Sequence, residues 1–168
     1  MTKAKAFALV EILAVVVVLG ILAAIVIPMA GSGTNAARTS CLAQDLRVMR
    51  THMLFYKSQH MNTAPGYPDG DKNQVPTEET LVNQTSLCST KDGQTASRGT
   101  PGFPYGPYLR NIPKNPFNDK KTIQMLGNAE DFPAAADDSH AWVYKAATAE
   151  MRADCTGADD NGKRYYDY

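Results

Sequence analysis

Apolar and polar residues divide the chain into an apolar N-terminal run, an amphipathic segment and a longer, mostly polar remainder. From Phe7 to Ala30 the run contains one charged residue, Glu11. A helix rises about 1.5 Å per residue, and the hydrocarbon core of a bilayer is about 30 Å thick. The run is therefore long enough to span a membrane as a helix.

The segment from Ala36 to His60 has the pattern of an amphipathic helix. Its apolar side chains and one histidine recur at spacings of four and three residues, which is typical of one helix face. These positions are Leu42, Leu46, Met49, Met53, Tyr56 and His60. Asn62 to Gly70 contains two prolines and two glycines, which are expected to end the helix. We therefore predict one nearly continuous helix from Phe7 to about His60, apolar in its first half and amphipathic in its second.

The polar remainder predicts a small sheet. Glu78 to Leu87 is expected to be a short helix, and the rest of residues 71–107 to be loop. Residues 142–144 and 149–153 have the composition of two strands, and residues 163–168 are expected to be a third strand or a packed tail. An antiparallel sheet laid against the amphipathic helix would bury the apolar faces of both. The expected fold class is therefore α+β.

Glu11 is the residue of the apolar run that needs an explanation. A carboxylate in hydrocarbon costs about 2.5 kcal/mol or more, so it usually has a partner. The apolar run is also longer than the core of a signal peptide, which is about 7–15 residues. The acid is understandable if the helix packs against copies of itself and Glu11 meets a positive charge on a neighbouring subunit.

Residues 5–11, KAFALVE, followed by the apolar run, resemble the N-terminal signal of type IV pilins and type II secretion pseudopilins. The resemblance implies that a prepilin peptidase cleaves between Ala6 and Phe7 and methylates the new amine of Phe7. Glu11 would then be the assembly glutamate that pairs with Phe7 of an adjacent subunit. The family nearly always has glycine where this chain has Ala6. In the family, the region corresponding to Gly20–Pro28 is where the helix loosens inside the filament.

Further residues are similar to the major pseudopilins of type II secretion. These are Tyr56-Lys57, Gln59-His60 and Pro65-Gly66 at the end of the long helix, and Tyr108-Leu109 followed by two proline-containing steps. The resemblance implies a pilin-like fold with a leader (residues 1–6), a transmembrane and assembly helix (7–30) and a periplasmic globular domain (31–168). At the turn before the second strand, Ala149 stands where the family usually has glycine.

The function implied is that of a structural subunit, not of an enzyme. It would polymerise into a pseudopilus with copies of itself, an inner-membrane assembly platform and minor pseudopilins as partners. It would sit in the inner membrane with its N-terminus cytoplasmic before assembly. The alternatives are a type IV pilus pilin and a membrane-anchored periplasmic binding module that does not polymerise.

Charge agrees with this placement. Lys and Arg number 17 and Asp and Glu number 17, so the net charge is zero and no basic excess favours nucleic acid. Lys3 and Lys5 precede the apolar run, and no further basic residue follows it until Arg38. This asymmetry favours a cytoplasmic N-terminus.

Cysteines and carboxylates give two further hypotheses. Three cysteines, Cys41, Cys88 and Cys155, allow three pairings, of which Cys88 with Cys155 is preferred because both fall in loop-like stretches. The alternative is that all three are free. No cofactor is required, but major pseudopilins often hold calcium in a C-terminal loop. Asp154, Asp159 and Asp160 are the calcium candidates, since carboxylates on a loop are suitable hard ligands.

Other chemistry is not indicated. Residues 157–163 have the spacing of a phosphate loop, but Arg164 stands where the magnesium-binding Ser or Thr is needed. His52, His60 and His140 show no metal-binding spacing, and His60 is expected to pack on the buried helix face.

Overall fold

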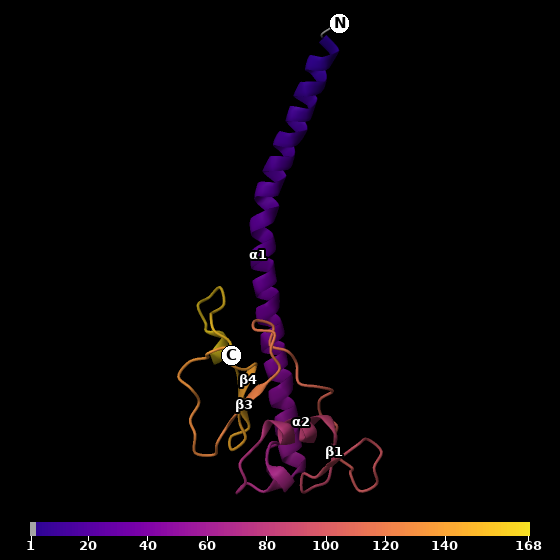
Figure 1. Cartoon of the computed structure of the whole chain (residues 1–168), viewed down its shortest axis with the longest axis vertical. Helices are drawn as coiled ribbons and strands as arrows, with labels where there is room; N and C mark the ends of the chain where they lie inside the picture. The colour runs from indigo at the N-terminus through magenta and orange to yellow at the C-terminus, as the bar shows by residue number, and fades with distance from the viewer. Residues whose placement is uncertain (1–2) are drawn as a thin grey trace. The chain divides into compact units, whose positions relative to one another are not determined.

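The computed structural model describes the backbone of residues 3–168 and the side chains of residues 10–22 and 34–168 (Figure 1). The chain divides into two compact units, Met1–Ala37 and Arg38–Tyr168. Helix α1, Lys3–Gln59, contributes residues to both. Among the described residues, no helix contains a stretch both long and apolar enough to cross a membrane. The predicted membrane-spanning run, residues 7–30, includes residues 7–9 and 23–30, whose side chains lie outside the described part.

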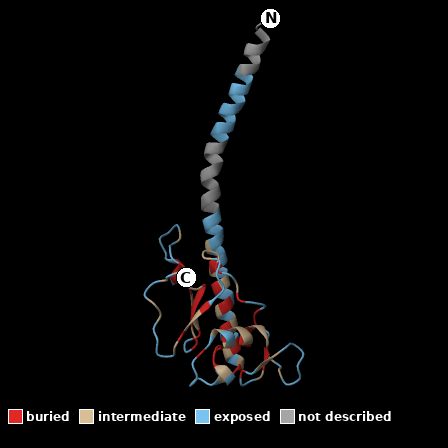
Figure 2. Cartoon of the chain, viewed as in Figure 1, coloured by how far each residue is buried: buried red, intermediate tan, exposed pale blue. Residues whose placement is uncertain are grey.

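The predicted buried face of α1 is confirmed in the second unit. All six positions, Leu42, Leu46, Met49, Met53, Tyr56 and His60, have exposed fractions of 2% or less. Figure 2 shows buried residues along this part of α1 and along the strands beside it. The helix ends at Gln59, one residue before the expected position, and the backbone then turns through left-handed conformations at Met61 (φ 51°) and Asn62 (φ 59°).

Helix α2, Glu78–Ser86, confirms the predicted short helix. Its N-cap is Thr77, whose hydroxyl oxygen accepts the backbone N–H of Thr80 at 3.2 Å. Glu78 and Glu79 lie in the first turn, where negative charge is favourable for the helix dipole. One short 3-10 helix, η1 (Pro68–Gly70), precedes it.

The main sheet has three strands in the order β3-β4-β5. They are β3 (Ile123–Leu126), β4 (Trp142–Lys145) and β5 (Glu150–Ala153). The β4–β5 hairpin is antiparallel, as predicted, but β3 pairs parallel to β4. The sheet is therefore mixed, and the antiparallel arrangement expected from the sequence holds for β4 with β5 but not for β3 with β4. The chain between β3 and β4 returns to the same end of the sheet before β4 begins, which is what a parallel pair requires.

One further segment decides between two alternatives, and another differs from the expectation. Residues 163–168 form no third strand: they hold the 3-10 helix η2 (Tyr165–Asp167), with Tyr165 and Tyr166 buried, so the packed tail is the correct alternative. The stretch predicted as loop contains a two-stranded antiparallel hairpin, β1 (Cys88–Ser89) and β2 (Thr95–Ala96). At the turn between β4 and β5, Ala149 takes the left-handed φ of 59° that usually favours glycine.

A hydrophobic core joins α1 to the sheet and to Leu109 and Ile112 of the segment before β3. Its buried members include Leu42, Leu46, Met49, Met53, Leu109, Ile112, Trp142, Tyr144 and Met151. Trp142 is the only tryptophan of the chain, and its Nε1–H donates to the carbonyl of Pro113 at 3.1 Å. The fold of the second unit is thus α+β, with one helix face covering one face of a small mixed sheet.

Arg50 ties α1 to the edge of this sheet. Its Nε and Nη2 donate to the carbonyl oxygen of Met151 at 2.9 and 2.7 Å, and its Nη1 donates to the carbonyl of Tyr168 at 2.9 Å. Burial lowers the pKa of the guanidinium, although the group keeps its charge at neutral pH. A single side chain therefore joins the helix, β5 and the tail after η2.

Replacing Arg50 by methionine tests this link. Met151 and Tyr168 would lose donors from a charged group, so we expect the free energy of unfolding to fall by about 2–3 kcal/mol. Urea unfolding of the full chain in detergent, followed by the fluorescence of Trp142, measures it. Arg47→Met is the matched control, because Arg47 is exposed on the same helix and should change stability by less than about 0.5 kcal/mol. Equal effects of the two substitutions would contradict the role given to Arg50.

His60 packs in the core as expected. Its ring stacks on Tyr56 with centroids 3.6 Å apart and an interplanar angle of 1°. Nδ1 lies 2.8 Å from the carbonyl oxygen of Tyr56, which only accepts, so Nδ1 carries a hydrogen. Nε2 lies 2.9 Å from the hydroxyl of Ser89 and accepts from it when the ring is neutral. Burial lowers the pKa of His60, so the folded state favours this neutral form.

Stability should consequently depend on pH through His60. The unfolded chain binds a proton to this ring below about pH 6.5, while the folded chain resists it, so stability falls as the pH drops through that value. We expect His60→Gln to remove part of this decline between about pH 6.5 and 5. Thermal unfolding across this range measures the difference. An equal effect of His52→Gln, which lies on α1 and is only partly buried, would contradict this role of His60.

Candidate functional site

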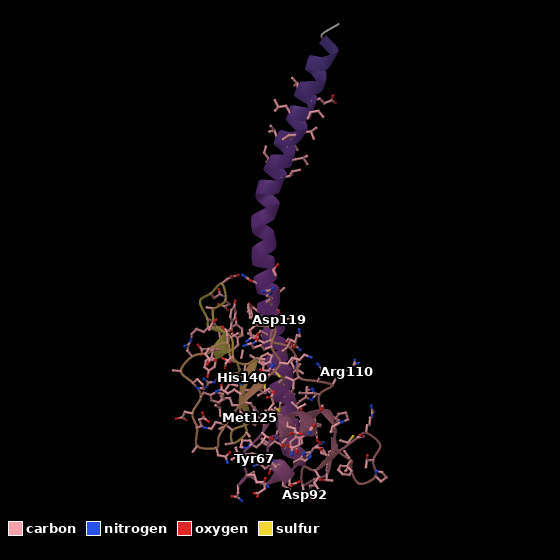
Figure 3. All side chains as sticks on the ribbon, viewed as in Figure 1. Tyr67, Asp92, Arg110, Asp119, Met125 and His140 are labelled. Carbon is pink, nitrogen blue, oxygen red and sulfur yellow. The ribbon has the colours of Figure 1, made fainter. Side chains whose placement is uncertain are left out.

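The described part of the first unit exposes apolar side chains. The large apolar residues between Val10 and Leu22 have exposed fractions of 51% to 65%. Glu11 is the one charged residue among them and is also exposed. Figure 3 shows these side chains standing out on both sides of the ribbon of α1. This stretch of helix has no polar face.

Such a surface is unfavourable in water. A helix that is apolar all round is normally buried, and burying a Val, Leu or Ile side chain fully gains about 1.5–3 kcal/mol. Ten such residues, each about half exposed, would gain roughly 10 kcal/mol when covered. Covering this stretch with an apolar partner would therefore be more favourable than leaving it in water.

The sequence also favours a helix only in an apolar surrounding. Val15 to Val18 are four consecutive β-branched residues, which lower helix propensity in water. In hydrocarbon, each unpaired backbone N–H or C=O costs several kcal/mol, so the helix is retained there because it pairs them internally. Helix propensity and backbone hydrogen bonding therefore favour this helix more in an apolar surrounding than in water.

The predicted assembly residues are only partly described. Glu11 and Gly20 lie in the described stretch, while the side chains of Ala6, Phe7 and Pro28 lie outside the described residues. Within the described part of the chain, no salt bridge involves the Glu11 carboxylate. A Cβ added to Gly20 would meet no atom within 4 Å. The site consists of one exposed acid on an apolar helix that no other described residue covers.

The calcium candidates do not assemble into one site. Asp154 is buried, and its two carboxylate oxygens accept the N–H of Asp137 at 3.0 Å and of His140 at 2.8 Å. Asp159 belongs to another loop, where it accepts the N–H groups of Asn161 and Lys163, each at 2.9 Å. Its remaining oxygen accepts from Tyr168, and this bond is the main cause that lowers the pKa of Asp159.

Asp160 is exposed beside this second loop. In the part of the chain that the structure describes, no three His, Cys, Asp or Glu side chains are placed to hold a metal ion. The carboxylates serve instead as acceptors for backbone N–H groups, which is the other common use of a carboxylate on a loop. Sequence spacing alone does not separate these two uses.

The expected disulfide is not formed. Cys88, Cys155 and Cys41 are all free, and the first two are buried while Cys41 is exposed. Cys88 opens β1, whereas Cys155 follows β5, and the two strands belong to different sheets. Burial raises the pKa of the Cys155 thiol to about 11, which disfavours the reactive thiolate. The alternative that all three cysteines are free is the one the structure has.

One cluster of polar residues was missed in the sequence. The hydroxyl of Ser139 lies 2.8 Å from Nδ1 of His140 and 3.2 Å from Oδ2 of Asp154. A nucleophilic triad needs the imidazole between the hydroxyl and the carboxylate. Here the Ser139 hydroxyl lies between the His140 ring and the Asp154 carboxylate, so the imidazole is not placed to activate it. The hydrogen bonds instead fix the loop before β4 against Asp154.

Comparisons with known proteins give no independent assignment. Protein-family models, curated proteins and solved structures all failed to match the chain. The features of the chain that bear on its function are the apolar helix with its one acid, the packed second unit and the sequence signal at residues 5–11.

The role of Asp154 can be tested with a metal control. Asp154→Ala leaves the N–H groups of Asp137 and His140 without acceptors, so we expect stability to fall by about 2–4 kcal/mol. EDTA or added calcium should shift the melting temperature of the unsubstituted chain by less than about 1 °C, since a metal held by the fold would shift it more. Asp160→Ala is the matched control and should have little effect. Stabilisation by calcium that Asp154→Ala abolishes would contradict this role.

Proposed function

We propose that this chain is a structural subunit of a type II secretion pseudopilus, which polymerises through its N-terminal helix to support protein export. The observation that carries the proposal is the exposed apolar helix between Val10 and Leu22, with Glu11 as its one charge. A surface of this kind suits a subunit that moves from a bilayer into a bundle of identical helices.

Each part of the chain has a role in this proposal. The run 7–30 holds the subunit in the inner membrane before assembly, and the second unit stays on the periplasmic side. A prepilin peptidase removes residues 1–6 and methylates Phe7. In the filament, the apolar helices of neighbouring copies pack together, and the assembly platform and minor pseudopilins act as partners.

Glu11 supplies register in this bundle. Paired with the methylated amine of Phe7 on an adjacent copy, its carboxylate would keep a counter-charge in an apolar surrounding. A buried ion pair adds little net stability compared with apolar packing, but removing one partner leaves a costly uncompensated charge. Copies shifted by even one turn would therefore be disfavoured, because the acid and the amine would no longer meet.

The alternative within the same membrane placement is an anchored binding module that does not polymerise. It needs the apolar run but gives Glu11 no function, and it predicts that residues 1–6 remain attached. The two proposals therefore differ in whether Glu11 has a function and in whether the peptide bond between Ala6 and Phe7 is cleaved.

Substituting Glu11 by alanine tests the proposal in the cells that produce the protein. We expect membrane insertion to persist and pelletable fibres to fall by more than about tenfold, because the amine of the neighbouring subunit loses its partner. Glu79→Ala removes an exposed acid of the second unit and is the matched control. Intact-mass measurement of the chain should find a species that begins at methylated Phe7. Retention of residues 1–6 together with normal fibres in Glu11→Ala would overturn the proposal.

A further inference from the structure

The second unit carries a cationic cleft between α2, the hairpin β1–β2 and the segment 107–112. Its volume is about 590 Å³, and it lies between Arg98 and Arg110, with Leu87, Cys88, Pro107 and Leu109 as apolar lining. A smaller hollow of about 320 Å³ shares Arg110 and continues past Val82 and Ile112 to Lys121. We name these two connected hollows the arginine cleft.

Positive charge in the arginine cleft exceeds negative charge. Arg98, Arg110 and Lys121 are all exposed, and none of them is in a salt bridge with a described residue. The one carboxylate in the lining, Glu78, accepts the backbone N–H of Ile123 at 2.9 Å. The cleft is therefore suited to a ligand that is negatively charged and partly apolar.

Two exposed apolar side chains, Leu54 and Phe55, lie next to the buried Tyr108 of the arginine cleft. Tyr108 lines it and contacts Phe55 of α1 edge to face, with ring centroids 6.0 Å apart. Phe55 and its neighbour Leu54 are 54% and 56% exposed. Arginine and aromatic side chains are enriched in the energetically important centres of protein interfaces. The surroundings of the cleft therefore favour a protein segment as its occupant.

The chain itself contains a complementary segment. In the loop between β3 and β4, Glu130 and Asp131 are adjacent and exposed. One oxygen of Glu130 accepts the backbone N–H of Gly127 at 3.0 Å, and the following Phe132 is partly buried within its own subunit, with the Arg152 guanidinium 4.3 Å from its ring. Asp131 has one nearby cation, Lys145 Nζ at 3.8 Å, and its side chain remains fully exposed, so this contact is weak. The other adjacent acids of the region, Asp137 and Asp138, also accept backbone N–H groups, and Asp138 is less exposed than Glu130 and Asp131.

This acidic segment and the arginine cleft lie apart within one molecule. Figure 1 shows the orange loop between β3 and β4 on the left of the second unit, and Figure 3 places Arg110 on its right. We propose that residues 129–132 of one copy dock in the arginine cleft of the next. This inference rests on the proposed function and names the surfaces through which the second units of neighbouring subunits recognise each other.

The arrangement has a consequence for the form of the assembly. A contact between two different surfaces of identical subunits is heterologous, and it forms an open helical array unless its rotation closes a ring. Each bound copy presents a new cleft and a new acidic segment, so the contact repeats along the fibre. Charge complementarity of this kind contributes more to specificity and register than to affinity.

Charge reversal with rescue tests the inference in the full chain. We expect Arg98→Glu with Arg110→Glu, and separately Glu130→Lys with Asp131→Lys, each to lower pelletable fibres by at least about fivefold through like-charge contact. All four substitutions together should restore at least about half of the yield, because opposite charges then face each other again. Lys91→Glu, an exposed reversal outside the cleft, is the matched control. Unchanged melting temperatures of the variants would show that folding is intact.

The outcomes separate this inference from the proposed function. Fibres that are unaffected by both reversals, or an effect of the arginine reversal that the four substitutions do not rescue, would overturn the docking of residues 129–132. In both cases the proposed function stands. If the unsubstituted chain forms no fibres, the proposed function fails instead. Cross-linking in detergent then decides the docking: Ser97→Cys with Ala129→Cys in a Cys41→Ser background should give covalent dimers, and the absence of dimers would overturn it.

Discussion

The packing of the second half of α1 on strands β4 and β5 is the contact on which the second unit depends. Three strands of four residues each supply few backbone hydrogen bonds, and a sheet of this size is not stable alone. Trp142, Tyr144 and Met151 gain their burial from the apolar face of the helix. Arg50 adds hydrogen bonds from the helix to the carbonyl oxygen of Met151 on β5. The sheet is therefore stable only when the helix covers its apolar face. In return, the sheet removes the apolar face of the amphipathic half of the helix from water.

The same helix has no such support between Val10 and Leu22. There its side chains are apolar on every side, and no described residue covers them. One continuous helix thus satisfies two different requirements along its length: a folded partner within the chain for residues 42–56, and an external apolar surrounding for residues 10–22. Under the proposed function this surrounding is first the bilayer and then the helices of sister subunits. Glu11 would gain a charged partner, the amine of Phe7 on a neighbouring copy, only in the second surrounding.

Local pattern predicted much of the fold, and contacts distant in sequence explain the rest. The spacing of Leu42, Leu46 and Met49 predicted the buried helix face, because a period of 3.6 residues is visible within one segment. Strand β3 was missed because it is short and its partner β4 begins only after a long return loop. Gln84 shows the same limit: it lies in a polar stretch, yet it is buried and bonds to Gly66, Tyr67 and Gly93. Polarity in a sequence does not say whether a carboxylate or an amide will meet water, a metal or a backbone N–H.

The two proposals give an assembled fibre two electrostatic contacts, one between Glu11 and Phe7 and one at the arginine cleft. These contacts differ in their exposure to water. The pair proposed for Glu11 and Phe7 would be surrounded by apolar helices, where screening by salt is weak. The contact proposed for the arginine cleft joins exposed groups, which salt at physiological strength screens within about 8 Å. The buried pair would therefore set the register of the helices under all conditions, whereas the cleft would select the approach of each new subunit before the apolar surfaces meet. A fibre that relied on apolar area alone would have neither control, because apolar helices pack at many offsets with similar energy.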